Sequence, residues 1–273
     1  MSGMTAQTHA ANPWDGLKRD AMPGYWLLAS LGKRVLRPGG IGLTRKMLDS
    51  LAITSRDSVV EFAPGMGVTA RLTLAKNPRQ YVAIDRNAAA TELLEREFAG
   101  AEGRRCIHAD AADPVDLPDG FATAVYGESM MTIHSEKNKR SIIGEVHRLL
   151  QPGGRYAMQE ISVLPDDIDG ELAETIRRDV MRAVRHPAWP KTTRQWREFM
   201  TEHGFEITAE HRREVRLLEP ERLVEDEGEA TAFRFAWNAL EDDVAVARIR
   251  EIRSVFNRYR ENLCAYCLVC RKL

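Results

Sequence analysis

The chain has 273 residues, with 39 lysines and arginines against 40 aspartates and glutamates, so its formal net charge is −1. Hydrophobic residues make up 44% of it and charged residues 29%, which is typical of a folded globular protein and argues against a disordered one. The near-zero charge argues against a protein that holds nucleic acid mainly by attraction to phosphates. No apolar stretch approaches the roughly 18 residues that would predict a membrane-spanning helix.

The N-terminal segment, residues 1–11, is polar and small, without a basic stretch followed by an apolar one. That pattern predicts no signal peptide. Four cysteines in a chain of this length do not indicate a disulfide scaffold. We therefore expect a cytoplasmic protein.

Short apolar runs alternate with helical patterns between about residues 58 and 160, which is typical of βαβ units in a parallel sheet. We predict five strands in this region, over residues 58–62, 81–85, 105–108, 121–126 and 156–158. Apolar spacing predicts an amphipathic helix over 142–150, which turn residues 151–154 end, and a weaker helix over 93–98.

The flanking segments have more helical patterns. Residues 12–50 predict helices with loops, and apolar spacing predicts another helix over 172–184. Thr192 or Thr193 is expected to cap a helix that runs to about residue 203. A sixth strand is predicted at 205–208, a long helix at 240–259 and a last strand at 263–270.

A glycine-rich loop follows the first predicted strand. Glycines let the backbone turn sharply, and the helix that begins after the loop presents free N–H groups to an anionic ligand group. Asp85 ends the second strand 20 positions after Gly65, where a carboxylate can accept hydrogen bonds from both hydroxyls of a ribose. The pattern Gly65-x-Gly67-x-x-Ala70 also fits the dinucleotide fingerprint, so a nicotinamide-dependent oxidoreductase is one alternative.

Further residues favour a different cofactor. Glu61 lies in the strand before the loop, where a carboxylate can receive the ammonium of an amino acid, and Asp110 follows the third strand, where an acid can meet an adenine amine. With these residues and the Pro152-Gly153-Gly154 turn, the chain resembles the class I S-adenosylmethionine-dependent methyltransferases over roughly residues 55–160. The flanks resemble the small-molecule, ubiquinone/menaquinone-methylase-like group.

The resemblance implies an α/β fold, with a Rossmann-like seven-stranded mixed sheet, helices on both faces, an antiparallel last strand and helical lid additions. It implies S-adenosyl-L-methionine as the cofactor. The family's acid-x-Gly-x-Gly-x-Gly loop falls on residues 61–67, with Ala63 in the place of the first glycine, which alanine tolerates if its backbone angles there are ordinary. The residues implied to bind the cofactor are Glu61, Ala63, Gly65, Gly67, Asp85, Arg86, Asp110, Ala111 and Glu128.

The acceptor is expected to bind beyond the carboxyl ends of the strands. Glu128 and His134 follow the fourth strand and are the candidate catalytic residues, with His134 as a base when the acceptor must lose a proton. The alternatives are a structural hydrogen bond for Glu128 and a helix-cap or surface position for His134. Candidate substrate-binding residues, for which core packing is the alternative, are Tyr25, Trp26, Met130, Met131 and Glu160. Together they favour a small, mostly apolar or aromatic acceptor.

The remaining patterns favour simpler interpretations. In a strand, Cys264 and Cys270 face one side and Cys267 the other, so we predict buried thiols and no metal. Arginines in residues 248–260 alternate with acids and indicate a solvated helix face, so no nucleic-acid partner is expected. A homodimer stays open, and a non-catalytic S-adenosylmethionine-binding protein is a second alternative.

We predict one methyltransferase domain over 1–273. It would comprise a helical lid at 1–52, a cofactor-binding core at 53–160, and substrate-side helices and C-terminal strands at 161–273.

Overall fold

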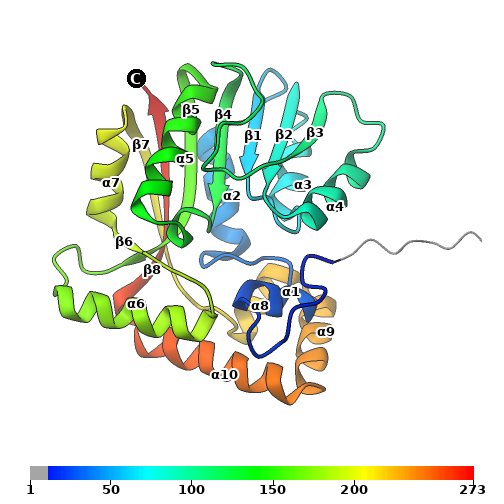
Figure 1. Cartoon of the computed structure of the whole chain (residues 1–273), viewed down its shortest axis with the longest axis vertical. Coiled ribbons are helices and arrows are strands. Elements are labelled where there is room, and N and C mark those ends of the chain that lie inside the picture. Colours follow the sequence, from blue (N-terminus) through cyan, green and yellow to red (C-terminus); the bar gives the residue numbers. More distant parts are fainter. Residues whose placement is uncertain (1–11) are drawn as a thin grey trace, which may run out of the picture.

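A mixed sheet forms the centre of the protein, as the computed structural model of residues 12–273 shows (Figure 1). Residues 1–11, and with them the prediction about a signal peptide, lie outside the described residues. Within residues 12–273 the sheet has eight strands in the order β3–β2–β1–β4–β5–β8–β7, with β6 beside β5. The strands are β1 (Ser58–Phe62), β2 (Gln80–Asp85), β3 (Arg104–His108), β4 (Ala122–Glu128), β5 (Leu150–Val163), β6 (Lys191–Thr192), β7 (Phe205–Glu214) and β8 (Leu263–Lys272).

The predicted strand directions are confirmed. β1 to β5 run parallel to one another, and β8 is antiparallel to both β5 and β7. The two-residue strand β6 is the one addition to the seven predicted strands within the described residues.

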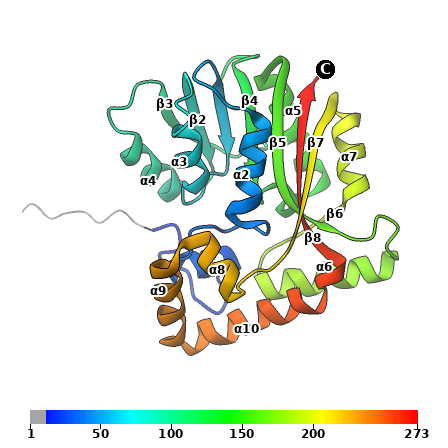
Figure 2. The ribbon, with the colours of Figure 1, turned by 180° about the vertical axis from the view of Figure 1, so that it is seen from behind.

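Helices cover both faces of the sheet (Figures 1 and 2). Successive strand residues point to opposite faces, so Val59 packs into the core beneath α2, α3 and α4, whereas Val60 packs into the core beneath α5 and α7. The same alternation places Cys267 in the first core and both Cys264 and Cys270 in the second, as predicted. The helices of the two faces are α2 (Gly40–Leu51), α3 (Val68–Leu74), α4 (Ala88–Phe98), α5 (Glu136–Leu149) and α7 (Thr193–Glu202).

A second group of helices lies beyond the carboxyl ends of the parallel strands, at the bottom of Figures 1 and 2. Its members are α1 (Gly24–Ser30), α6 (Gly170–Val184), α8 (Pro220–Glu227), α9 (Glu229–Leu240) and α10 (Asp243–Arg258). Single 3₁₀ turns, η1 (Met131–Ile133) and η2 (Arg260–Asn262), complete the elements. Among residues 12–273, no helix has the length and apolar character needed to cross a membrane.

Several strands extend beyond their predicted ends. β5 begins at Leu150 and runs to Val163, so the predicted turn at 151–154 lies within the strand, where its register with β4 shifts. At its other end Gln159, Glu160 and Ser162 are polar but buried, because β5 is an inner strand with helices such as α2 and α5 packed on its two faces. A prediction based on apolar runs therefore ends too early, and for the same reason it placed Glu128 and Glu160 after strands that in fact contain them.

The bounds of α6, α7 and α10 lie close to the predicted ones, whereas α4 begins at Ala88 and α5 at Glu136, before the predicted starts at 93 and 142. The Thr192 hydroxyl accepts from Gln195 N at the start of α7, and the Gln195 side chain accepts from Thr192 N, which forms a capping box. Asp242 caps α10 by accepting from Ala245 N at 2.9 Å. Helices α8 and α9 were missed, because α8 is mostly acidic and α9 presents large apolar residues to solvent.

Helix α8 holds the segment between α1 and α2. Lys33 Nζ lies 3.3 Å from an Asp226 carboxylate oxygen and 3.2 Å from one of Glu227, and all three side chains are almost wholly buried. The same carboxylates accept backbone hydrogen bonds from Ile41 and Val35, both at 2.8 Å. The segment that leads into α2 is thus fixed by residues nearly 200 positions away in the chain.

Candidate functional site

The loop between β1 and α3 uses left-handed backbone conformations. Gly65 and Gly67 have φ of 53° and 70°, and Ala63 also has φ of 53°. Alanine was expected to be tolerated at position 63 only if its backbone angles are ordinary, and they are not. Ala63 is therefore strained, because its φ lies in the region that favours glycine. A Cβ on Gly65 would meet no atom within 4 Å, whereas one on Gly67 would lie 2.5 Å from Leu94 Cδ2. Gly65 leaves space for a ligand, and Gly67 lets α3 pack against α4.

Asp85 lies at the end of β2, beside this loop. Its carboxylate accepts hydrogen bonds from Gly65 N at 3.2 Å and from Asn87 N at 2.9 Å. Burial raises the pKa of Asp85, and these two hydrogen bonds oppose the rise. The side chain thus both fixes the loop and presents a carboxylate to the space beyond it, with Arg86 exposed next to it.

Asp110 and Ala111 follow β3 on the same edge of the sheet. The Asp110 carboxylate accepts from Ala112 N at 2.9 Å, which holds the loop in a turn. Both residues line the same cavity as Asp85 and Gly65. The carboxyl ends of neighbouring parallel strands thus bring these acids together, as predicted.

Glu61 lies within β1 and is buried among tyrosines. The Tyr126 hydroxyl donates to its carboxylate at 2.6 Å, and the Tyr81 hydroxyl donates to the same oxygen. Burial raises the pKa of Glu61 to about 7, against the lowering effect of the two hydroxyls. A cation placed beside this carboxyl would favour its ionised form.

Glu128 ends β4 and is the centre of a polar network. Its carboxylate accepts from the hydroxyls of Thr44 and Thr69, at 2.6 and 2.5 Å, and from the Gln159 amide. Arg37 Nε lies 3.4 Å from the same carboxylate. Sequence analysis found Glu128 from its place after a strand, but missed these neighbours, because no spacing rule links residues so far apart in the chain.

Glu160, predicted to bind substrate, has a structural hydrogen-bonding position. It is fully buried, and its carboxylate accepts from the backbone N–H groups of Met130, Met131 and Thr132 at 2.9, 2.8 and 3.1 Å. These bonds hold the 3₁₀ turn η1 against β5. Burial raises the pKa of Glu160 while the backbone donors oppose it.

His134 follows η1 and faces the cavity, although only 8% of its surface is exposed. Burial lowers its pKa below the ordinary histidine value, with the nearby Asp110 acting in the opposite direction. Tyr25 and His186 lie against each other in an edge-on contact, with ring centroids 5.4 Å apart, and both also line the cavity.

The cavity has a volume of about 490 Å³, within the range usual for small-molecule sites. Its inner half is polar, formed by the loops after β1 to β4. Its outer half is apolar, formed by α1, α6, α10 and the chain after β7. The predicted site residues that line it are Tyr25, Trp26, Glu61, Ala63, Gly65, Asp85, Arg86, Asp110, Ala111, Glu128, Met130, His134 and Glu160. Gly67 and Met131 do not line it.

The inner half fits a nucleoside joined to an amino acid. The open space over Gly65 admits a close approach to the backbone, and the carboxylates of Asp85 and Asp110 are suited to hydroxyl and amine donors. Glu61 offers a buried partner for an ammonium group. Ser129 Oγ is buried beside Glu128 without a hydrogen-bond partner, as expected for a group that a ligand completes.

Comparison with known proteins agrees with this geometry. Residues 59–154 match a family model described as a methyltransferase domain. The chain is similar to an uncharacterized protein of Haemophilus influenzae, with 29% identity over 222 residues, which are 80% of this chain and 85% of that protein. It is also similar to a demethylmenaquinone methyltransferase of Clavibacter sepedonicus, with 28% identity over 42% of this chain and 46% of that one.

A solved structure shares the fold over most of its length. It is the geranyl diphosphate C-methyltransferase of Streptomyces coelicolor A3(2), bound to Mg²⁺, geranyl diphosphate and S-adenosyl-L-homocysteine. The TM-score is 0.61 at 11% identity, over 85% of this chain and 80% of that one. The chain therefore carries a methyltransferase domain over residues 59–154, with the fold of the class I S-adenosylmethionine-dependent methyltransferases and a cavity at the ends of its strands.

Proposed function

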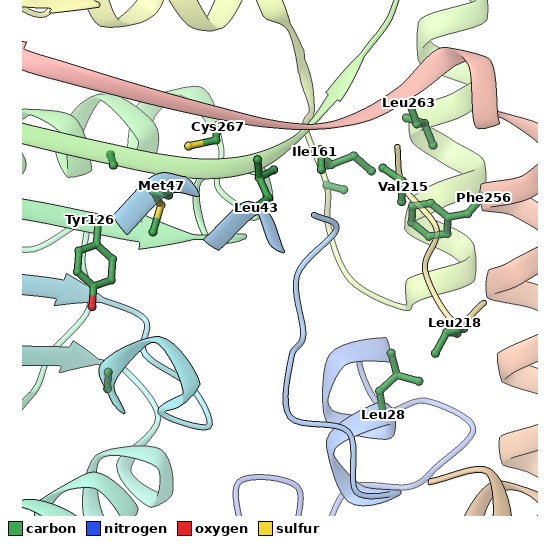
Figure 3. Packing of buried hydrophobic residues seen from close by; sticks show 14 of the residues in the cluster. Leu28, Leu43, Met47, Tyr126, Ile161, Val215, Leu218, Phe256, Leu263 and Cys267 are labelled. Carbon is green, nitrogen blue, oxygen red and sulfur yellow. The ribbon is translucent and has the colours of Figure 1, made fainter. Parts of the chain in front are cut away.

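We propose that the enzyme transfers the methyl group of S-adenosylmethionine to a small, mostly apolar acceptor bound in the outer half of the cavity. The lining of that half carries the proposal. Its apolar residues come from elements far apart in the chain and are Leu28, Leu36, Ile161, Val180, Val184, Val215, Leu217, Ile252 and Phe256. Figure 3 shows Ile161, Val215 and Phe256 close together, each from a different element. Burying apolar acceptor groups against such a wall contributes about 0.8 kcal/mol per methylene.

The polar groups that would orient the acceptor are few. Tyr25, His134 and His186 line the cavity together with the apolar residues of the outer half. S-adenosylmethionine supplies an electrophilic methyl group when bound. The chain's own contribution is to hold the acceptor atom in line with that methyl group and to exclude water.

His134 is the residue we propose as general base. Its lowered pKa keeps the imidazole neutral near pH 7, so a ring nitrogen can accept a proton from an acceptor hydroxyl or amine. Glu128 is a poorer base, because its carboxylate oxygens already accept hydrogen bonds from Thr44, Thr69 and Gln159. We propose instead that Glu128 faces the cofactor, together with Glu61, Asp85 and Asp110.

An acceptor screen tests the substrate class. Phenols, amines and thiols that share a nucleophile but differ in the size of their apolar body are compared by the rate of S-adenosylhomocysteine formation. We expect kcat/KM to rise with apolar size by roughly fourfold for each methylene that is buried. Equal rates for polar and apolar acceptors would contradict the proposal.

A matched pair of variants locates the acceptor. Val184→Asn places an amide in the outer half of the cavity, whereas Val244→Asn changes an exposed residue outside it. We expect the first variant to raise KM for an apolar acceptor about tenfold with cofactor affinity retained, and the second to change neither. An unchanged KM in Val184→Asn would place the acceptor elsewhere.

His134→Gln tests the base. With an acceptor that must lose a proton, kcat should fall by about 10²-fold or more, while the dissociation constant of S-adenosylmethionine is retained. Because the pKa of His134 is lowered, the wild-type rate should decline with acid only below about pH 6.5, the ordinary histidine value. A wild-type rate that declines already above that value would exclude His134 as the titrating group.

A further inference from the structure

Arg37 is a buried cation that lines the cavity and has donors without a hydrogen-bond partner. It lies between α1 and α2, lines the cavity beside Glu128, and is only 9% exposed. Its Nε and Nη2 atoms are buried and have no hydrogen-bond partner. A guanidinium buried in this state costs free energy unless an acceptor reaches it.

Glu128 does not satisfy these donors. Arg37 Nε lies 3.4 Å from its carboxylate, beyond good hydrogen-bond distance. The two Glu128 oxygens already accept from Thr44, Thr69 and Gln159. The guanidinium therefore has its charge partly balanced but its N–H groups free.

The two free donors lie on one edge of the guanidinium. Nε–H and the adjacent Nη2–H point in nearly the same direction, which matches the two oxygens of a carboxylate. Two other arginines in the described residues line the cavity, Arg34 and Arg86, and both are exposed. Arg37 is thus the arginine best placed for a buried ligand group.

We propose that Arg37 binds the methionine carboxylate of S-adenosylmethionine through Nε and Nη2. The amino-acid end of the cofactor carries an ammonium and a carboxylate, and the inner half of the cavity holds both complementary charges. Glu61 can receive the ammonium, and Arg37 can receive the carboxylate. This positions the sulfonium between the two halves of the cavity, next to the acceptor.

The backbone next to Arg37 is held in place before the cofactor arrives. The neighbouring Pro38 and Gly39 carbonyls accept from Arg222 and Arg213, at 3.4 and 3.3 Å. A Cβ on Gly39 would clash with Gln159 Oε1 and lie 2.7 Å from Leu43 Cβ, so the chain passes close to β5 and α2 at this glycine. An arginine on a fixed backbone loses less conformational entropy on binding a ligand than one on a mobile segment, which favours affinity.

Calorimetric titration with two cofactors tests the proposal. Decarboxylated S-adenosylmethionine keeps the adenosine, sulfonium and ammonium but lacks the carboxylate. We expect Arg37→Met to weaken S-adenosylmethionine binding by about 10- to 100-fold, the range for loss of a charged hydrogen-bonded pair, and to leave binding of the decarboxylated compound nearly unchanged. Arg45→Met, which removes an exposed arginine of α2 outside the cavity, should match the wild type for both.

Two results would overturn the proposal. An equal loss for both compounds would mean that Arg37 only supports the fold of the site. No loss for either would mean that its donors serve the acceptor or another anion. Arg37→Lys keeps the charge but not the two-donor edge, so it should recover only part of the affinity and serves as a second variant if Arg37→Met is unstable. If the titrations contradict the role of Arg37, the proposal of an apolar acceptor still stands, because no acceptor is present in them.

A second inference comes from the outer face of α9. Phe233, Trp237 and Leu240 are 70%, 56% and 73% exposed, and we call them the α9 stripe. Their spacing of four and three residues places them on one face, and the Phe233 and Trp237 rings stack with centroids 6.4 Å apart. Val224 and Val244 are also exposed, on helices that pack against α9. Aligned apolar residues of this size mark an interaction surface.

The charges beside the α9 stripe are self-complementary. Arg234 and Glu241 lie seven positions apart, so they are on the same flank, and neither pairs with another side chain of the described residues. In an antiparallel pair of α9 helices with a two-fold axis near Trp237, Arg234 would face Glu241 of the partner subunit, twice. We infer that the α9 stripe docks against a second copy of this chain.

Light scattering during size-exclusion chromatography tests this dimer. We expect the wild type to be dimeric at micromolar concentration and Trp237→Glu to be monomeric. Arg234→Glu should weaken the dimer by roughly 10-fold, and the double change Arg234→Glu with Glu241→Arg should restore it. Arg250→Glu, at an exposed position on α10, is the control. A monomeric wild type, a dimeric Trp237→Glu, or a double variant no better than the single one would overturn the inference.

Discussion

The alanine at the start of the glycine loop adopts a conformation that glycine adopts at lower cost. With φ of 53°, Ala63 bears a strain of roughly 1–2 kcal/mol, whereas glycine in the unfolded chain adds only about 0.5–1 kcal/mol of entropy. We therefore expect Ala63→Gly to raise the free energy of unfolding by up to about 1 kcal/mol in urea titrations. Ala90→Gly, inside α4, should lower it by about the same amount. If both variants lost a similar amount of unfolding free energy, Ala63 would not be strained.

Glu61 gives the stability of the protein a pH dependence. Its pKa is raised from 4.5 to about 7 in the folded state, so its contribution to stability is complete below about pH 4.5 and is lost as the pH rises through 7. Glu61→Gln removes this titration while keeping an oxygen that can accept from the Tyr81 and Tyr126 hydroxyls. Without cofactor, the wild type should lose stability relative to Glu61→Gln between pH 5 and 8, roughly. Parallel unfolding curves would show that the pKa of Glu61 is ordinary.

At the scale of elements, the contact between α8 and the segment after α1 depends on one lysine. Lys33→Met would leave Asp226 and Glu227 buried with only backbone donors. We expect the free energy of unfolding to fall by roughly 3 kcal/mol, since breaking a buried ion pair strands its partner charge. Lys46→Met, at an exposed position of α2, should change it by less than about 0.5 kcal/mol. A small effect of Lys33→Met would show that the backbone donors suffice.

Elements were predictable where burial and apolar character coincide. β1 was predicted to the residue, because all five of its side chains are buried and most are apolar. β5 was underestimated because Gln159 and Glu160 are polar although buried, and β7 because its residues after Phe205 are half-buried or exposed and mostly polar. Asp85 and Asp110 were found because the ends of parallel strands meet at one edge. Arg37 was not, because residues of β7 and α8, far later in the chain, hold the segment that carries it.

At the scale of the whole molecule, cofactor binding should be visible as added stability. S-adenosylmethionine or S-adenosylhomocysteine at 100 times its dissociation constant adds about 2.7 kcal/mol to the folded state. For a domain above 200 residues this raises the Tm by roughly 5 to 10 °C, whereas NADH should give no shift. A shift with NADH alone would contradict the methyltransferase assignment and favour hydride transfer.

The contact of Lys33 with α8 also implies an order in which parts of the site can form during translation. Lys33 leaves the ribosome 193 residues ahead of Asp226, an interval of roughly 10 to 40 seconds at ordinary elongation rates. The strands and loops that form the inner half of the cavity, within residues 59–154, are synthesised during that interval. The anchor for the Arg37 segment is synthesised later, so the segment between α1 and α2 can be fixed only after the strands and loops at the other end of the cavity have been made.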